Sequence, residues 1–238
     1  MKKIAIIDYG AGNLFSVRAA IMRSFAAHNE PSSNSELSSD EKSASNHNAS
    51  SNNPLSDDNI FFAQTPLDLA KASHIILPGV GAFADCITTL QSYKGMIAAM
   101  EHEIFTNHKP FLGICVGMQM LFEYGNEHGR HAGLGWLEGE VKALQPFPEI
   151  KIPHIGWNEL HNVSPHPLMA SVQNGDDAYF VHSYHATNVN QAHILATTEY
   201  GQQIIAVIGK DNILGTQFHP EKSHKTGAII LDNFINIG

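Results

Sequence analysis

The sequence predicts an α/β protein in which a doubly wound, mostly parallel sheet is flanked by helices. Three segments carry this prediction, because each runs from a short apolar strand through a glycine-containing turn into a helix. In the first segment, residues 3–8 form the strand and residues 14–27 form an amphipathic helix, with two glycines between them. The second segment begins with a strand at 74–77, and the third begins with a strand at 111–114. Such alternation is typical of parallel strands joined by crossover helices.

The remaining elements follow from local periodicity, with apolar spacings of three and four for helices and β-branched runs for strands. Helices are expected at 66–71, 82–90, 96–107, 116–124 and 223–234. Further strands are expected at 60–63, 140–144, 179–183, 194–197, 204–208 and 213–217.

The length of 238 residues suits one domain spanning 1–238. The composition changes sharply at 28–59, where Ser, Asn, Asp and Glu predominate and Leu37 and Leu55 are the only large apolar residues. Such a segment cannot bury enough apolar surface to offset its ordering entropy. We therefore expect a disordered, low-complexity insert in a surface loop of the domain.

Charge and cysteine content argue against several kinds of partner. The formal net charge is −9 and the chain has no basic run, so nucleic acid and anionic membranes are poor partners. No apolar run approaches the roughly 20 residues of a membrane helix, and the first apolar run stops at Asp8, too early for a secretory signal. Two cysteines, Cys86 and Cys115, fit a reducing compartment. We therefore expect a cytoplasmic protein.

Cys115 lies between a predicted strand and a predicted helix, in Gly113-Ile114-Cys115-Val116-Gly117. This is the nucleophile-elbow pattern with sulfur in place of oxygen. The turn lifts the side chain off the sheet edge and places it at a helix N-terminus, where free N–H groups favour a thiolate. We predict that Cys115 is a nucleophile, although the pattern alone also allows a buried structural cysteine.

His219 is the predicted base, in Thr216-Gln217-Phe218-His219-Pro220-Glu221 directly after a predicted strand. A thiol nucleophile needs a base, and a carboxylate that orients the imidazole and stabilises its cation completes a triad. His219 and Glu221 lie side by side if the backbone is extended, or meet through a bend at Pro220. Because the carboxyl ends of parallel strands gather at one edge, His219 can reach Cys115 there.

A third motif, Leu77-Pro78-Gly79-Val80-Gly81, also follows a predicted strand. Attack on a carboxamide builds negative charge on oxygen, which backbone N–H donors must stabilise. The N–H of Val80 or Gly81, with that of Val116, could form this oxyanion hole. An ordinary strand-to-helix turn remains the alternative for this motif.

Six motifs extend over almost the whole chain except 28–59. They are IDYGAGNL at 7–14, LPGVGAF at 77–83, GICVGMQ at 113–119, PHIGWN at 153–158, YFVHSY at 179–184 and HPEKS at 219–223. Together they resemble the class I (triad) glutamine amidotransferases and, within them, the glutaminase subunits of imidazole glycerol phosphate synthase. PGVG in place of the PGG of most triad amidotransferases is the form typical of this subunit and is therefore a specific discriminator.

The resemblance implies a flavodoxin-like fold and hydrolysis of glutamine to glutamate and ammonia, with no cofactor. It implies a triad of Cys115, His219 and Glu221, and an oxyanion hole of Gly79, Val80, Gly81 and Val116. It assigns substrate binding to Gln119, Glu127 and the backbones of Ser183 and Tyr184, and a partner interface to Asn13, Trp157, Tyr179 and Lys222. The partner is a (β/α)8-barrel cyclase subunit in a heterodimer, which uses the ammonia to make imidazole glycerol phosphate and AICAR in histidine biosynthesis.

Two features depart from the family pattern. The insert at 28–59 follows the first helix, so we expect it at the sheet edge opposite the nucleophile, with no effect on catalysis. His185 stands where Arg or Tyr is more usual, which affects a contact at the rim of the site.

Other interpretations have weaker support. Gly10-Ala11-Gly12 begins like a dinucleotide fingerprint, but Phe15 occupies the third glycine position. His182 and His185 are too few for a zinc site, so no metal is expected, and Cys86 is expected to be a small core residue. A triad glutaminase serving a different synthase and a catalytically silent binding module on this fold remain alternative functions.

Overall fold

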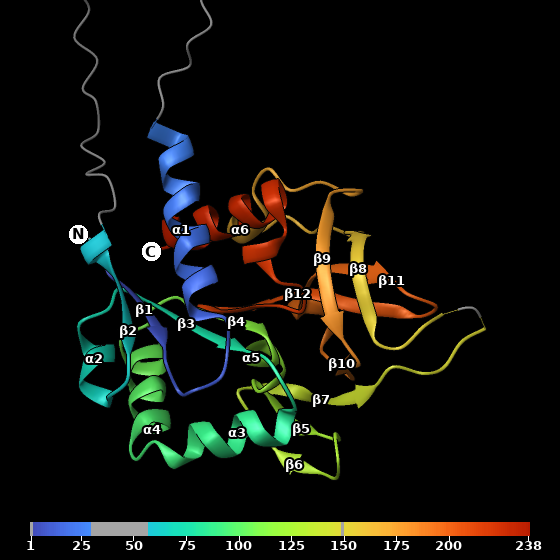
Figure 1. Ribbon diagram of the computed structural model, residues 1–238, viewed down its shortest axis with the longest axis horizontal. Helices are drawn as coiled ribbons and strands as arrows, with labels where there is room; N and C mark the ends of the chain where they lie inside the picture. The colour runs from blue at the N-terminus through green and yellow to red at the C-terminus, as the bar shows by residue number, and fades with distance from the viewer. Residues whose placement is uncertain (1, 30–56, 149) are drawn as a thin grey trace, which may run out of the picture.

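A central sheet of seven strands organises the molecule (Figure 1). The computed structural model describes residues 2–29, 57–148 and 150–238, so most of the insert predicted at 28–59 lies outside the described residues. The strands of this sheet are β1 (Ile4–Ile7), β2 (Ile60–Ala63), β3 (His74–Gly79), β4 (Phe111–Cys115), β11 (Ile194–Glu199), β12 (Gln203–Lys210) and β13 (Ile213–Thr216).

The strand order is β11-β12-β13-β4-β3-β1-β2. From β2 to β13 every neighbouring pair is parallel, whereas β12 and β11 add an antiparallel edge. The doubly wound, mostly parallel prediction is therefore confirmed. The chain leaves β1 toward β2 and returns on the other side as β3, which makes the carboxyl edge near β1 and β3 a topological switch point, where ligands bind in such sheets.

Helices cover both faces of this sheet (Figure 1). On one face, α1 (Leu14–Asn29) packs against α6 (His224–Asn236). The other face carries α2 (Pro66–Ala70), α3 (Phe83–Ser92), α4 (Met96–Glu101), which continues as a π-helical turn (His102–Thr106), and α5 (Val116–Gln119). Every residue of β1, β3, β4 and β13 is buried, as expected for central strands covered on both sides.

Two smaller sheets lie beside the central one. The first has the order β10-β7-β5-β6, made of β5 (Phe122–Gly125), β6 (His131–Ala132), β7 (Leu137–Ala143) and β10 (Tyr184–Thr187). The second is a hairpin-like pair of β8 (His154–Glu159) and β9 (Asp177–His182), antiparallel with Trp157 opposite Tyr179.

The prediction of one helix over 116–124 is wrong. The helix α5 ends at Gln119, and Phe122–Gly125 is strand β5, which pairs with β7. Buried apolar residues such as Met118, Leu121 and Phe122 suit either a buried helix or a buried strand, so local periodicity could not separate them. The pairing with β7 decided the structure. The sequence did not predict β6, β8 or β10, because these strands contain no run of buried apolar residues.

In the described part of the chain, no helix combines the length and the apolar character needed to cross a membrane.

Candidate active site

Cys115 ends β4 in a sharp turn that leads directly into α5. Its backbone angles, φ 54° and ψ −111°, lie outside the regions that non-glycine residues prefer, which costs about 1–3 kcal/mol. The flanking glycines make the turn possible, because a Cβ on Gly113 would come within 2.7 Å of Gly117 O and a Cβ on Gly117 would overlap the Leu77 carbonyl. The elbow thus places the Cys115 sulfur at the N-terminus of α5, where helix N–H groups favour negative charge.

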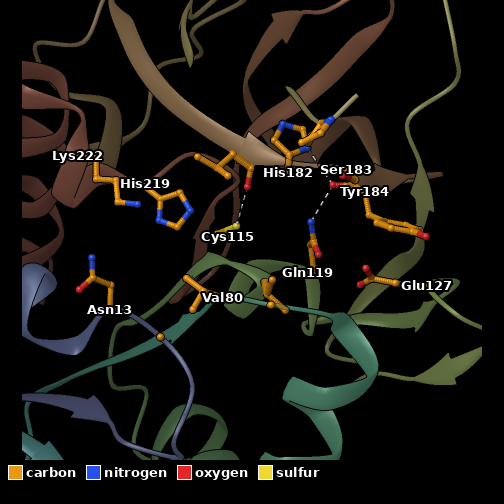
Figure 2. A pocket seen from close by; sticks show the side chains of 15 residues that line it. Asn13, Val80, Cys115, Gln119, Glu127, His182, Ser183, Tyr184, His219 and Lys222 are labelled. Carbon is orange, nitrogen blue, oxygen red and sulfur yellow. Dashed lines mark hydrogen bonds between the residues drawn. The ribbon is translucent and has the colours of Figure 1, made fainter. Parts of the chain in front are cut away.

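Three neighbouring strands bring the predicted catalytic groups together at one edge. In the register of the sheet, Gly79 of β3 lies opposite Cys115 of β4, and Ile114 lies opposite Thr216 of β13. His219 follows β13 by three residues and therefore emerges beside the end of β4. This explains how residues far apart in the sequence line one pocket (Figure 2).

His219 and Glu221 meet through a bend rather than along an extended strand. Residues Pro220–Lys222 form a 3-10 turn, and His219 Nδ1 lies 2.9 Å from Glu221 Oε1. The backbone is held from both sides, because His219 N donates to Tyr179 O at 3.0 Å and Ser223 Oγ donates to His219 O at 2.7 Å. This contact uses Glu221 Oε1, whereas Glu221 Oε2 is buried with no hydrogen-bond partner among the described residues, so the carboxylate depends on the imidazolium for stabilisation.

The environment favours the protonated form of His219. Burial by itself lowers the pKa of this histidine, but the hydrogen bonds and charges of Cys115 and Glu221 outweigh burial and raise the pKa to about 10. The Cys115 sulfur on one side and the Glu221 carboxyl group on the other therefore favour an imidazolium between them. A cysteine beside an imidazolium is the arrangement of an activated cysteine nucleophile.

The predicted oxyanion strand runs along the pocket beside Cys115. Tyr9 Oη donates to Pro78 O at 2.9 Å, and Cys86 Sγ donates to Val80 O at 3.4 Å. Because the C=O and N–H of a trans peptide point in opposite directions, the N–H of Gly81 points away from Cys86. Gly81 has φ +109°, a conformation that favours glycine, and both Val80 and Gly81 line the pocket.

The predicted substrate residues lie around the same cavity, whose volume is about 670 Å³. Gln119 Nε2 donates to Tyr184 O at 2.8 Å, and Glu127 Oε2 accepts from Phe83 N at 2.7 Å. Ser183 and Tyr184 form the wall opposite Val80 (Figure 2). The far end of the pocket thus presents a carboxylate and a carboxamide, which can hold the polar end of a small amino acid.

The residues predicted to face a partner gather at the pocket mouth. Asn13 and Lys222 line the pocket itself, and Lys222 Nζ lies 5.9 Å from the Tyr179 ring centroid. Trp157 stacks on His224 with ring centroids 5.0 Å apart and remains 47% exposed. A half-exposed tryptophan beside a polar pocket opening is typical of a binding surface.

The sequence analysis did not predict two polar groups that support the site. His154 Nδ1 lies 3.0 Å from His182 Nε2, and His182 Nδ1 donates to Tyr184 O at 3.0 Å. Burial lowers the pKa of His154 to about 4 and, with the neighbouring histidine, lowers the pKa of His182 to about 3, so both rings are neutral at pH 7. No local sequence pattern marked these two, among the 15 histidines of the chain, as residues that support the site.

Gln217 is the second such group, and its side chain contacts both Gln119 and Cys115. The period of two in a strand could have predicted that Gln217 faces the site, because Gln217 and His219 are two residues apart and point to the same side of an extended segment.

The structure buries His185 instead of placing it at the rim. His185 is only 5% exposed and does not line the pocket, and burial lowers the pKa of its ring to about 4. Cys86 is buried as expected, but it also contacts the oxyanion strand. Within the described ranges, no group of three or more His, Cys, Asp or Glu side chains is arranged to hold a metal ion.

The fold and the cysteine–histidine–glutamate arrangement define a class of protein. The family model for glutamine amidotransferase class-I matches residues 41–237, and the chain therefore belongs to this family. Solved structures agree on the fold: a Thermotoga maritima glutamine amidotransferase has a TM-score of 0.55 and 17% identity, covering 99% of this chain and 83% of that one. The glutaminase domain of CTPS from Trypanosoma brucei, with bound acivicin, has a TM-score of 0.58 and 14% identity, covering 99% and 94%.

Curated relatives narrow the family to the HisH subunits of imidazole glycerol phosphate synthase. The HisH subunit of Brucella abortus is 41% identical over 237 residues, which is 98% of each chain. That of Zymomonas mobilis is 39% identical over 235 residues, 98% of this chain and 95% of the relative. That of Cereibacter sphaeroides is 46% identical over 177 residues, 74% of this chain and 84% of the relative.

Proposed function

We propose that this chain is the glutaminase subunit of imidazole glycerol phosphate synthase and that it hydrolyses glutamine to glutamate and ammonia. The observation that carries the proposal is the convergence of Cys115 and His219 in one pocket whose far end carries Gln119 and Glu127, with Glu221 bound to His219. A nucleophile, a base and an amino-acid-sized cavity are the parts that this reaction needs.

The first half of the reaction forms a thioester. The Cys115 thiolate attacks the carboxamide carbon of glutamine, and the carbonyl oxygen takes up the negative charge. The backbone N–H of Val116, with that of Gly81 or Val80, stabilises this oxyanion, each donor contributing about 3–4 kcal/mol. His219 then gives its proton to the leaving nitrogen, the C–N bond breaks, and ammonia departs.

The second half regenerates the enzyme. His219, now neutral, takes a proton from water, and the resulting hydroxide attacks the γ-glutamyl thioester. The C–S bond breaks, the new carboxyl group of glutamate loses its proton to solvent, and the Cys115 thiolate is restored beside an imidazolium. Glu221 stays ionised throughout and stabilises the imidazolium whenever it forms, as the acidic member of a triad does.

Ammonia leaves through the mouth of the pocket toward a cyclase subunit. Asn13 and Lys222 border this opening, and Trp157 and Tyr179 extend the surface beside it. We infer that these four residues contact a (β/α)8-barrel cyclase in a heterodimer located in the cytoplasm. That subunit would combine the ammonia with its phosphoribulosyl substrate to give imidazole glycerol phosphate and AICAR, a step of histidine biosynthesis.

The test measures glutamate release from glutamine by the full chain, alone and mixed with the cyclase subunit. We expect hydrolysis that Cys115→Ala abolishes, while the complex carrying Cys115→Ala still makes imidazole glycerol phosphate from added ammonium chloride. Activity retained by Cys115→Ala would refute the nucleophile. Hydrolysis stimulated only by another synthase's subunit would indicate a different partner, and absence of hydrolysis with an intact cyclase would indicate a silent binding module.

A further inference from the structure

Gln217 is a fully buried polar side chain, 0% exposed, that the proposed mechanism does not use. A carboxamide withdrawn from water costs free energy unless hydrogen bonds replace those it made with solvent. Both of its side-chain partners, Cys115 and Gln119, belong to the candidate active site. A core-filling role alone would be served equally by an apolar residue of similar size.

The first contact is with the nucleophile. Gln217 Nε2 lies 3.8 Å from Cys115 Sγ and donates a hydrogen bond to it, whereas Val181 O, also 3.8 Å from the sulfur, can only accept. The amide N–H therefore favours the thiolate, and the carbonyl favours the thiol.

The titratable groups that act on this sulfur are His219, Tyr9 and Cys86. Burial raises the pKa of Tyr9 and the pKa of Cys86, so both are neutral near pH 7. The charge on His219 and the N–H of Gln217 are thus the side-chain groups that stabilise the thiolate.

The second contact fixes which way the Gln119 carboxamide points. Gln217 Oε1 accepts a hydrogen bond from Gln119 Nε2 at 3.0 Å, and Tyr184 O accepts another from the same nitrogen at 2.8 Å. A carboxamide nitrogen has two N–H bonds, so both are used. Gln119 must then present its oxygen to the pocket, because a flipped amide would set that oxygen against two acceptors (Figure 2).

We infer that Gln217 is a positioning residue with two effects: it stabilises the Cys115 thiolate and it locks Gln119 with its carbonyl oxygen toward the ligand. The inference rests on the proposed glutaminase function. An amide oxygen accompanied by the Glu127 carboxylate makes this end of the pocket an acceptor of hydrogen bonds, which fits the α-ammonium group of glutamine. Gln217 thereby links substrate orientation and thiolate formation through one side chain.

The test uses Gln217→Met, which keeps the length of the side chain but removes its donor and acceptor, with Gln217→Leu as a second variant. Gln119→Met is the matched control, because it removes the carboxamide that faces the ligand, with its hydrogen bonds to Gln217 and Tyr184, but keeps the donor that Gln217 offers to Cys115. Two quantities are measured on the full chain: the pH midpoint for alkylation of Cys115 by iodoacetamide, followed on its own peptide by mass spectrometry, and the KM for glutamine in the complex with the cyclase. Thermal unfolding reports whether each variant is folded.

Both Gln217 variants should raise the alkylation midpoint by about 1 pH unit and the KM by about tenfold, since each effect reflects one lost hydrogen bond. Gln119→Met should raise the KM and leave the alkylation midpoint at the wild-type value. A purely structural role would lower the unfolding temperature without moving the midpoint. Either a wild-type midpoint or a wild-type KM in folded Gln217 variants overturns the inference.

The results would be different if the proposed glutaminase function, and not the role of Gln217, were wrong. In that case the wild-type complex would not hydrolyse glutamine, although alkylation of Cys115 would still report the contact with Gln217.

Discussion

Acidification from pH 7 to pH 5 should strongly lower the free energy of unfolding, because the folded protein buries histidines in their neutral form. His154, His182 and His185 have pKa values lowered from 6.5 to about 4, 3 and 4, with burial as the first cause in each case. A histidine with a lowered folded pKa contributes stability above pH 6.5, and this contribution is lost as the pH falls toward the folded value, because the unfolded chain binds the proton first.

The size of the effect follows from these shifts. At pH 5 the unfolded form of each histidine is almost fully protonated and the folded form is not, which lowers the free energy of unfolding by about 2 kcal/mol per histidine relative to pH 7. The three together give about 6 kcal/mol. His219, whose pKa is raised to about 10, acts in the opposite direction, but its contribution changes by less than about 1 kcal/mol over this interval. The loss is comparable with the total stability of many domains.

The measurement is urea unfolding followed by circular dichroism at pH 7, 6 and 5, extrapolated linearly to water. His185→Phe isolates one of the three protons, since His185 is buried, its Nδ1 has no hydrogen-bond partner among the described residues, and it does not line the pocket. The pH-dependent loss in this variant should be smaller than in the wild type by about 2 kcal/mol. An identical pH dependence in the two proteins would refute the assignment of a neutral buried histidine at this position.

Three further outcomes are expected. Glu221→Gln should lower kcat for glutamine hydrolysis by roughly 10²–10⁴-fold with a folded protein, because the imidazolium loses its carboxylate; steady-state kinetics with a circular-dichroism control decide it, and an unchanged kcat contradicts it. Cys86→Ala should lower kcat by about threefold with KM unchanged, because Val80 O loses its donor, whereas Cys86→Ser should preserve kcat; equal kcat values for the two variants would speak against that contact. Trp157→Ala should weaken cyclase binding by about 2 kcal/mol in calorimetry, with cyclase-independent glutamine hydrolysis unchanged; wild-type affinity would exclude this surface.

The central sheet was predictable because its strands are locally encoded. Segments such as 3–8, 74–77 and 111–114 are short, apolar and closed by glycine turns, and the structure places them as β1, β3 and β4. The strands β6, β8 and β10 were not predictable in this way, since their sequences HA, HIGWNE and YHAT contain no apolar β-branched run. Strand β5 continues the apolar segment of α5, so its pairing with β7 and not its local preference decides its structure.

The residues of the candidate site also differ in how far the sequence could predict them. The elbow at Cys115 and the segment from His219 to Glu221 are local motifs, so their residue types and spacing could be read directly. Gln217, by contrast, matters because of two contacts made across the fold, and a single glutamine carries no local signal.

The amino edge of the central sheet has a practical consequence. Helix α1 ends at Asn29 and the turn before β2 begins at Asp57. In a parallel sheet, both a helix end and the following strand start lie at the amino edge, whereas Cys115 follows the carboxyl end of β4. A fluorophore attached through Asp58→Cys, at an exposed position in this turn, would therefore lie at the amino edge of the sheet and leave the cavity and its mouth free for both the amino acid and a docking subunit.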